Sequence, residues 1–207
     1  GNWLKVFLEN RVKNITGIDG DWVQENMLVI PKESFHKLNF EEQLPIQYKA
    51  DLAVCLEVAE HVSDKASGTL INNLTQIAPV VLFSAAIPLQ GGSRHINEQW
   101  PDYWTALFEK EGYIPVDCIR RKIWTDKQVS FFYAQNIFIY VKKENLSSYP
   151  QLQKEIEAGN GSALPLVHPY MFMYYAERWR TVVPVLGKFP PSFLHAAKRF
   201  LNFLKRK

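Results

Sequence analysis

Short, mainly apolar runs alternate with helical stretches through the first two-thirds of this 207-residue chain. The clearest run is Pro79-Val-Val-Leu-Phe-Ser84, and others lie at 15–19, 27–30, 51–56, 115–119 and 135–141. Apolar residues at helical spacing predict helices at 2–10, 67–77 and 100–110. A strand without polar alternation must be covered on both faces. The pattern therefore predicts an α/β fold with a doubly wound, mostly parallel sheet.

The end of this region predicts one reversed strand. The runs at 115–119 and 135–141 are joined by a loop without clear helical periodicity, whereas a parallel pair needs a crossover, usually a helix. We therefore expect these last two strands to pair antiparallel. The polar segment 142–164 contains Pro150, Gly159 and Gly161, and is predicted to be a linker. The predicted organisation is a core at 1–141, this linker, and a helical C-terminal extension at 165–207.

The charge of the chain is unevenly distributed. Residues 165–207 contain eight Lys and Arg and a single acid, Glu177, whereas the remainder has 16 basic and 20 acidic residues. The favoured interpretation is a solvated amphipathic helix at 192–207 that packs on the core. Contact with an anionic membrane surface ranks second. Contact with nucleic acid ranks third, because no RNA-binding motif accompanies the charge.

Cysteine usage and hydropathy bear on the compartment. Cys55 and Cys118 lie far apart in apolar runs, so we expect two buried thiols rather than a disulfide. The uncharged stretch 66–92 contains several amides and Pro79, and is predicted to be a helix followed by a buried strand, not a membrane span. No secretory leader opens the sequence. We therefore expect a cytoplasmic protein, with the inner face of a membrane as an additional location if the tail binds lipid.

Three segments resemble class I, Rossmann-like S-adenosylmethionine-dependent methyltransferases. Asp51-Leu-Ala-Val-Cys-Leu-Glu-Val-Ala-Glu-His61 resembles the signature that follows the fourth strand of this family. The segment 80–88 resembles the fifth strand and its loop, and Ile18-Asp-Gly-Asp21 resembles the end of the second strand. Gly1-Asn-Trp-Leu4 is similar to the last glycine of the family's Gly-rich loop and the helix after it. We therefore expect the native protein to extend upstream with the first strand and the rest of that loop.

The resemblance implies roles for residues at the carboxyl ends of the strands, where open parallel sheets bind ligands. From its chemistry alone, Asp19 either accepts hydrogen bonds from a ribose diol or caps a turn. The resemblance assigns it to the ribose of S-adenosylmethionine. Asn39 would meet the adenine amino group, with Phe40 as a backbone donor or stacking ring. The other implied cofactor contacts are Gly1, Gly20, Asp21, Trp22, Leu56 and Glu57.

Four further side chains suggest chemistry at the same edge. Glu57, Glu60 and His61 are spaced so that one helical turn would bring them to one face, and His95 follows the fifth strand. Two carboxylates and two imidazoles form a credible set of ligands for a divalent metal. The layout resembles that of small-RNA 2′-O-methyltransferases and of ubiquinone-biosynthesis O-methyltransferases. We nevertheless favour a metal-free interpretation, in which His61 or His95, together with Glu60, is a general base or substrate anchor.

The sequence as a whole predicts an S-adenosylmethionine-dependent methyltransferase that acts on a hydroxyl of a small molecule, sugar or lipid-linked glycan. The main alternative is a catalytically inactive Rossmann-like module that binds a nucleotide or a partner. A metal-dependent RNA 2′-O-methyltransferase ranks below it. A dehydrogenase is disfavoured because the Glu-x-x-Glu-His segment has no dehydrogenase counterpart.

Overall fold

The computed structural model describes residues 1–45 and 48–186, with side chains in the last helix described as far as residue 178. The chain divides into two compact units, Gly1–Pro165 and Leu166–Lys207. The described part of the second unit contains helix α7 (Pro169–Leu186), which includes the aromatic stretch at 170–179. The amphipathic helix predicted at 192–207 lies outside the described residues. Within the described residues, every helix is too short or too polar to cross a bilayer.

Two sheets form the framework of the first unit. In the smaller sheet, β1 (Gly17–Asp19) pairs in parallel with β2 (Phe35–Lys37). The larger sheet has the strand order β3-β4-β6-β5. Here β3 (Ala53–Leu56) and β4 (Val80–Ser84) are parallel, and β6 (Phe138–Lys142) is antiparallel to both β4 and β5 (Tyr113–Val116). The last strand is therefore the reversed one, which confirms the prediction.

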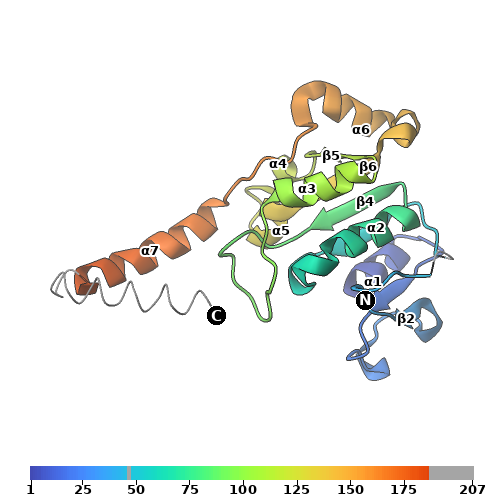
Figure 1. Cartoon of the computed structure of the whole chain (residues 1–207), viewed down its shortest axis with the longest axis horizontal. Coiled ribbons are helices and arrows are strands. Elements are labelled where there is room, and N and C mark those ends of the chain that lie inside the picture. Colours follow the sequence, from blue (N-terminus) through green and yellow to red (C-terminus); the bar gives the residue numbers. More distant parts are fainter. Residues whose placement is uncertain (46–47, 187–207) are drawn as a thin grey trace. The chain divides into compact units, whose positions relative to one another are not determined.

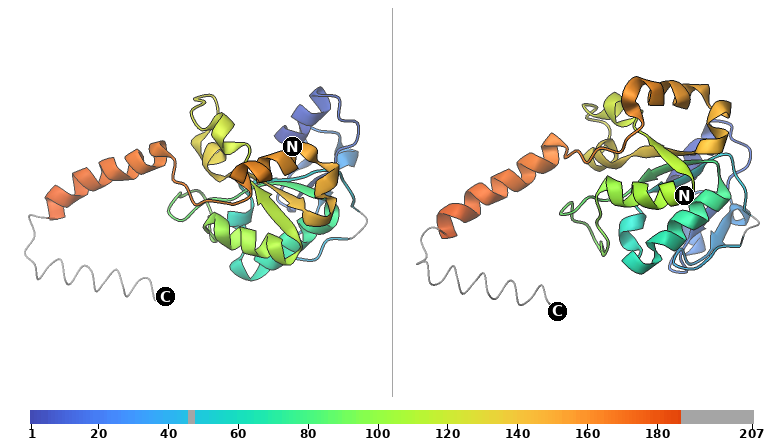
Figure 2. Two further views of the ribbon diagram at one scale, coloured as in Figure 1. Left: turned by 90° about the horizontal axis from the view of Figure 1, so that it is seen from above. Right: turned by 45° about the horizontal axis from the view of Figure 1, so that its top comes forward.

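Helices lie on both sides of the larger sheet, as a doubly wound arrangement requires (Figure 1). Figure 2 shows α2 (Ser67–Ile77) and α3 (Pro101–Lys110) on one side, with α1 (Asn2–Glu9), α4 (Arg120–Ile123) and α5 (Phe131–Asn136) on the other. Aromatic side chains fill the space under α3, where Phe108 stacks on Tyr140 with ring centroids 3.8 Å apart. The uncharged strands are thus buried on both faces, which accounts for their composition.

The apolar run at 27–30 is not a strand. It begins at the end of a 3-10 turn, η1 (Glu25–Met27), and Met27 is 62% exposed whereas Ile30 is buried. Pro31 precedes a second 3-10 turn, η2 (Lys32–Ser34), and only after this turn does the chain extend alongside β1. The partner of β1 is therefore β2, which lies after Pro31. Two of its three residues, His36 and Lys37, are polar, so its sequence does not indicate a buried strand.

The connection between β5 and β6 also differs from the expected loop. It contains α4 and α5, which have four and six residues. Helices this short give no readable amphipathic period, because the period needs at least two turns to become apparent. The predicted strand at 135–141 begins only at Phe138, since residues 135 and 136 complete α5.

The segment 142–164 packs against the larger sheet instead of forming an extended linker. It contains the 3-10 stretch η5 (Lys143–Ser148), α6 (Pro150–Glu155) and a distorted turn, η6 (Ile156–Asn160). Four of its apolar side chains pack against the buried cluster that contains Val116 and Val141; they are Leu146, Tyr149, Leu152 and Ile156. These four residues are three or four positions apart, a spacing that polar neighbours and Pro150 obscure in the sequence.

Both cysteines are buried free thiols, as expected. Burial raises the pKa of Cys55 to about 12, and repulsion from Glu60 and Glu57 adds to this effect. The pKa of Cys118 is raised for the same leading reason.

Candidate active site

The chain turns sharply at Glu57, directly after β3. Glu57 has a φ of 53°, in the left-handed region that residues with side chains seldom adopt. Its N–H donates to the carbonyl oxygen and to the hydroxyl oxygen of Ser84, both at 3.0 Å. The ends of the neighbouring parallel strands β3 and β4 are thereby joined, and the strain of about 1–3 kcal/mol is held by the surrounding structure.

A buried group of amides fixes the carboxylate of Glu57. It accepts hydrogen bonds from Gln90 Nε2 at 2.9 Å and from Asn136 Nδ2 at 3.1 Å. Gln90 Oε1 in turn accepts from Asn136 at 2.8 Å and from Gln135 at 3.2 Å. Sequence reasoning missed this network. Its signal is the adjacent pair of amides in an otherwise aromatic and apolar run before β6.

Glu60 and His61 lie on a single 3-10 turn, η3 (Ala59–His61). The predicted helical face shared by Glu57, Glu60 and His61 is wrong, because the left-handed turn at Glu57 separates it from η3. The group that the structure brings together is Glu60, His61 and His95, whose candidate ligand atoms all lie within 4.8 Å of one another.

Glu60 is fully buried, and neither carboxylate oxygen has a hydrogen-bond partner among the described residues. Oε1 faces His95 Nε2 at 3.9 Å, beyond hydrogen-bonding distance. The main-chain carbonyl of Glu60 accepts from the amides of Ile96 and Asn97, at 2.9 and 3.1 Å, which attaches the loop after β4 to η3. Burial raises the pKa of Glu60 to about 8, and repulsion from Glu57 contributes in the same direction.

The two imidazoles are oriented by different partners. His95 Nδ1 lies 2.9 Å from Oε1 of Glu98, which also accepts hydrogen bonds from the amides of Leu89 and Gly91. His61 Nδ1 lies 3.2 Å from the carbonyl oxygen of Arg94. The two rings meet edge to face with centroids 4.9 Å apart. Because both Nδ1 atoms face acceptors, we assign each Nδ1 as a donor.

The predicted ribose contact lies at the end of the smaller sheet. Asp19 is the last residue of β1, and its Oδ1 accepts from the amide of Gly20 at 2.8 Å. The exposed ring of Trp22 covers Gly20, where a Cβ atom would lie 2.1 Å from it. Asp21 is exposed beside them. The turn after β1 is therefore capped by its own side chains.

The predicted adenine contacts are engaged in local structure. Asn39 accepts from the amide of Glu41 and donates to Glu42, both at 3.0 Å, so its side chain stabilises the turn after β2. An adenine contact would have to replace one of these bonds. Phe40 is half-buried and packs on the core. Glu41 accepts from the amide of Ser63 at 2.7 Å, which brings this turn close to η3.

The remaining candidates, Leu56 and Gly1, could contact a cofactor mainly through main-chain atoms. Leu56 is buried in β3, and Gly1 is the exposed first residue before α1. A Cβ atom at Gly1 would lie 3.3 Å from Ile30, so the start of α1 packs close to the segment between the first two strands.

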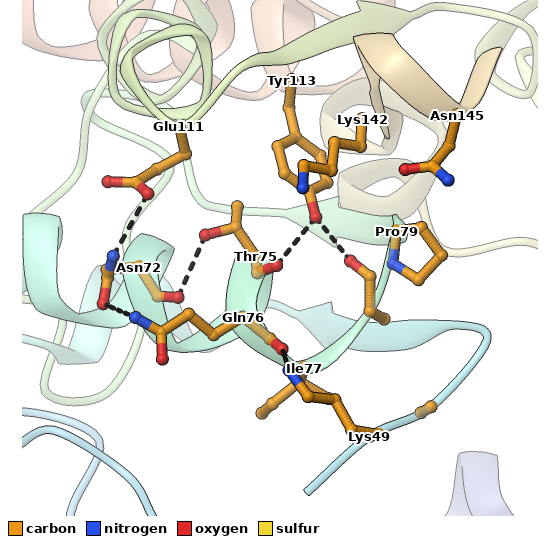
Figure 3. A pocket seen from close by; sticks show the side chains of 12 residues that line it. Lys49, Asn72, Thr75, Gln76, Ile77, Pro79, Glu111, Tyr113, Lys142 and Asn145 are labelled. Carbon is orange, nitrogen blue, oxygen red and sulfur yellow. Dashed lines mark hydrogen bonds between the residues drawn. The ribbon is translucent and has the colours of Figure 1, made fainter. Parts of the chain in front are cut away.

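A cavity of about 440 Å³ lies at the opposite end of the larger sheet, between the start of β4 and the end of β6 (Figure 3). Its polar side chains serve the fold: Tyr113 donates to the carbonyl oxygens of Thr75 and Ala78, and Lys49 donates to that of Gln76. The cavity is therefore separate from the cluster around Glu60, which lies at the carboxyl ends of β3 and β4.

No family model and no curated protein matches the sequence. Several solved structures are similar. The magnesium protoporphyrin IX methyltransferase of Synechocystis PCC 6803, with bound SAH, is 18% identical with a TM-score of 0.37, over 53% of this chain and 51% of that one. CalO1, a methyltransferase of calicheamicin biosynthesis, also SAH-bound, is 16% identical with a TM-score of 0.45, over 67% and 44%.

The methyltransferase domain of the bacterial protein CtHen1-CN is 16% identical with a TM-score of 0.48, over 68% of this chain and 85% of that domain. This chain thus spans about half the length of the first two proteins. At these identities and TM-scores the likeness supports no inference about the reaction. Any proposal about the reaction must rest on the residues of this chain.

Proposed function

We propose that this protein transfers a methyl group from S-adenosylmethionine to a hydroxyl oxygen of a small molecule, sugar or lipid-linked glycan. The observation that carries the proposal is the polar cluster after β3 and β4. Glu57, Glu60, His61 and His95 come from the loops that follow two adjacent parallel strands. In open α/β sheets that edge is where ligands bind.

The cofactor would lie between the ends of the two sheets. Asp19 is the candidate acceptor for the ribose hydroxyls, since a carboxylate forms stronger hydrogen bonds to a diol than a neutral group does. Glu57 is suited to the cationic methionine end of the cofactor. Its carboxylate is held in place by Gln90 and Asn136, so no side-chain freedom has to be lost when the cation binds.

The acceptor hydroxyl would lie beside Glu60 and His95. In the reaction the acceptor oxygen forms a bond to the methyl carbon while the carbon–sulfur bond breaks, leaving its electron pair on sulfur. The hydroxyl proton must also depart. Since the sulfonium already carries a good leaving group, alignment of oxygen, carbon and sulfur supplies much of the rate. The polar cluster then has to orient the hydroxyl and receive or release its proton.

Calorimetric titration of the full-length protein with S-adenosylhomocysteine tests the cofactor assignment. We expect micromolar binding that Asp19→Ala weakens about fivefold or more, corresponding to about 1 kcal/mol. Asp102→Ala, which removes an exposed acid from the first turn of α3, is the matched control and should leave binding unchanged. Absence of both heat and a thermal shift in a folded sample would contradict the proposal and favour the inactive binding module.

A further inference from the structure

We propose that the second compact unit, Leu166–Lys207, binds the surface of an anionic phospholipid membrane through helix α7 and its basic residues. Membrane binding requires neither cofactor nor acceptor, so it is testable apart from methyl transfer. Two observations of different kinds support it. The described part of the unit exposes a group of apolar side chains, and the sequence of the unit is strongly basic.

The first half of α7 exposes apolar side chains. Residues 164–176 contain no Asp, Glu, Lys or Arg. Phe172 is 63% exposed and Met173 is 49% exposed. The other large apolar side chains exposed in this part of the unit are Leu166, Val167, Tyr170 and Tyr174. Single exposed apolar residues are common on protein surfaces, whereas a group of neighbouring ones marks contact with a partner or a membrane.

Three of these side chains share one face of the helix. Tyr170, Met173 and Tyr174 are three and four residues apart, so they are neighbours along α7. Two of the three are tyrosines, which have an apolar ring and a polar hydroxyl and are enriched where a membrane meets water. The hydroxyl of Tyr174 accepts a hydrogen bond from Arg178 at 2.7 Å, which places a cation beside the aromatic rings. This face is therefore suited to the level of the lipid headgroups.

The charge of the unit indicates which lipids it binds. Its sequence holds a single acid, Glu177, and eight cations, which are Arg178, Arg180, Lys188, Lys198, Arg199, Lys205, Arg206 and Lys207. Anionic headgroups attract a segment of this charge, whereas zwitterionic ones do not. One weak signal gives only reversible binding to a membrane, and a second signal strengthens it. The apolar face of α7 and the basic residues supply two such signals in one unit.

Other partners fit only one of the two observations. Single-stranded RNA would be attracted by the cations and could stack bases on the aromatic rings, but the aliphatic side chains of Leu166, Val167 and Met173 give it no ring to stack on. A second copy of the unit would bring two strongly basic segments together, and these repel. An anionic membrane accommodates the aliphatic side chains, the tyrosines and the positive charge.

The experiment uses flotation of the full chain, without an affinity tag, with vesicles of defined composition. Vesicles of phosphatidylcholine alone are compared with vesicles that also contain about 30% phosphatidylglycerol. We expect binding to the anionic vesicles to be tighter by about tenfold or more, and to weaken as NaCl is raised from about 0.1 to about 0.5 M. No binding of the folded protein to anionic vesicles would overturn the proposal and favour docking of the unit on the acidic remainder of the chain.

Two matched variants test the face of α7. Met173→Asp places a carboxylate on this face and should weaken binding to anionic vesicles by about tenfold or more, because an apolar contact is lost. Met27→Asp makes the same change at another exposed methionine, on η1, and should change binding by less than about twofold. Since both variants have the same net charge, their difference reports position alone. Equal effects of the two substitutions would overturn the assignment to α7.

A milder substitution keeps the proposal testable if Met173→Asp does not fold. Met173→Cys is labelled briefly with an environment-sensitive dye, while the two native thiols are buried. We expect the dye to shift its emission to the blue on anionic vesicles, and the same dye on Met27→Cys to show no shift. No shift at position 173 would contradict the proposal. Binding of a short single-stranded RNA by a protein that ignores the vesicles would overturn it and assign the charge to nucleic acid.

Discussion

The imidazole ring of His95 lies over Gly92, in space that any side chain at position 92 would occupy. A Cβ atom there would come within 2.2 Å of Nε2 and 2.4 Å of Cε1. The absence of a side chain at Gly92 therefore allows the His95 ring to lie beside both Glu98 and Glu60.

Gly92→Ala is expected to displace the His95 ring from its position beside Glu98 and Glu60, because the added methyl group and the ring cannot occupy the same space. Since the change lies in an exposed loop, the free energy of unfolding should change little. Gly68→Ala is the matched control. A Cβ atom there meets nothing within 4 Å, and helix α2 should gain about 0.5–1 kcal/mol. Solution NMR of the histidine ring signals and chemical unfolding of both variants check the prediction. Ring signals of His95 that stay unchanged in Gly92→Ala would refute it.

Arg120 is a buried charge with a complete set of partners. Its guanidinium forms a bidentate pair with Asp117, donates to the carbonyl oxygens of Gln135 and Leu164, and lies 4.2 Å from the ring centroid of Phe138. Arg120→Met leaves Asp117 buried without its cation. We expect a loss of about 3–5 kcal/mol in the free energy of unfolding.

The exposed pair between Lys32 and Glu25, at 2.7 Å, provides a control for charge removal. Lys32→Met should change the free energy of unfolding by less than about 1 kcal/mol, because exposed pairs contribute little. The double variant Arg120→Met with Asp117→Leu should recover much of the loss, since no unpaired charge remains. Urea unfolding measures all three. Equal effects of the Arg120 and Lys32 substitutions would show that burial of the pair is unimportant.

Alkaline pH should destabilise the fold through Tyr113. Its hydroxyl donates to the carbonyl oxygens of Thr75 and Ala78, and burial raises its pKa to about 12. The protonated phenol is thus favoured in the folded state. Its stabilising effect is complete below the unfolded pKa of about 10 and is lost as the pH rises through about 12.

Comparison with Tyr113→Phe isolates this contribution from other groups that titrate at high pH. Near pH 8 we expect the variant to be less stable by about 1 kcal/mol, because the hydroxyl's hydrogen bond, shared between two carbonyl oxygens, is lost. The difference between the proteins should shrink as the pH is raised above about 10. Urea unfolding at a series of pH values measures it. A difference that stays constant with pH would mean that Tyr113 ionises as freely in the folded state as in the unfolded one.

The two thiols should be protected in the native protein. Because the thiolate is the reactive form and burial disfavours it, Cys55 should react with thiol reagents only as fast as the protein opens. Cys118 should also be slow. In denaturant both should react at the rate of a free thiol. Immediate labelling of Cys55 at neutral pH in the folded protein would contradict its buried position.

Local pattern was sufficient for much of the fold. Helix α2 lies at the predicted residues, and strands β3 and β4 lie within the predicted runs, because burial on both faces leaves a direct trace in composition. The antiparallel last strand followed from a connection in which no crossover helix of clear periodicity could be recognised. Pattern failed where elements are too short to display a period, as in α4 and α5, or where polar neighbours interrupt an apolar face, as in the segment 142–164.

The site could be predicted only in part for a related reason. His61 and His95 were found because imidazoles at the ends of strands carry a chemical signal of their own. The separation of Glu57 from Glu60 depends on a left-handed backbone at Glu57 and on its bonds to Gln90 and Asn136, which lie 33 and 79 residues away in the chain. Spacing along the sequence carries no information about such partners.

The pairing of strand β3 predicts how its amide hydrogens exchange with solvent. Among the described residues it pairs with β4 alone. Since Glu57 donates its amide to Ser84 of β4, alternation along the strand directs the amides of Ala53 and Cys55 to the same side and those of Val54 and Leu56 to the other. In deuterated solvent we therefore expect neighbouring residues of β3 to exchange their amide hydrogens at different rates. The amides of Val54 and Leu56 should exchange by local fluctuation, and those of Ala53 and Cys55 only when the sheet itself opens.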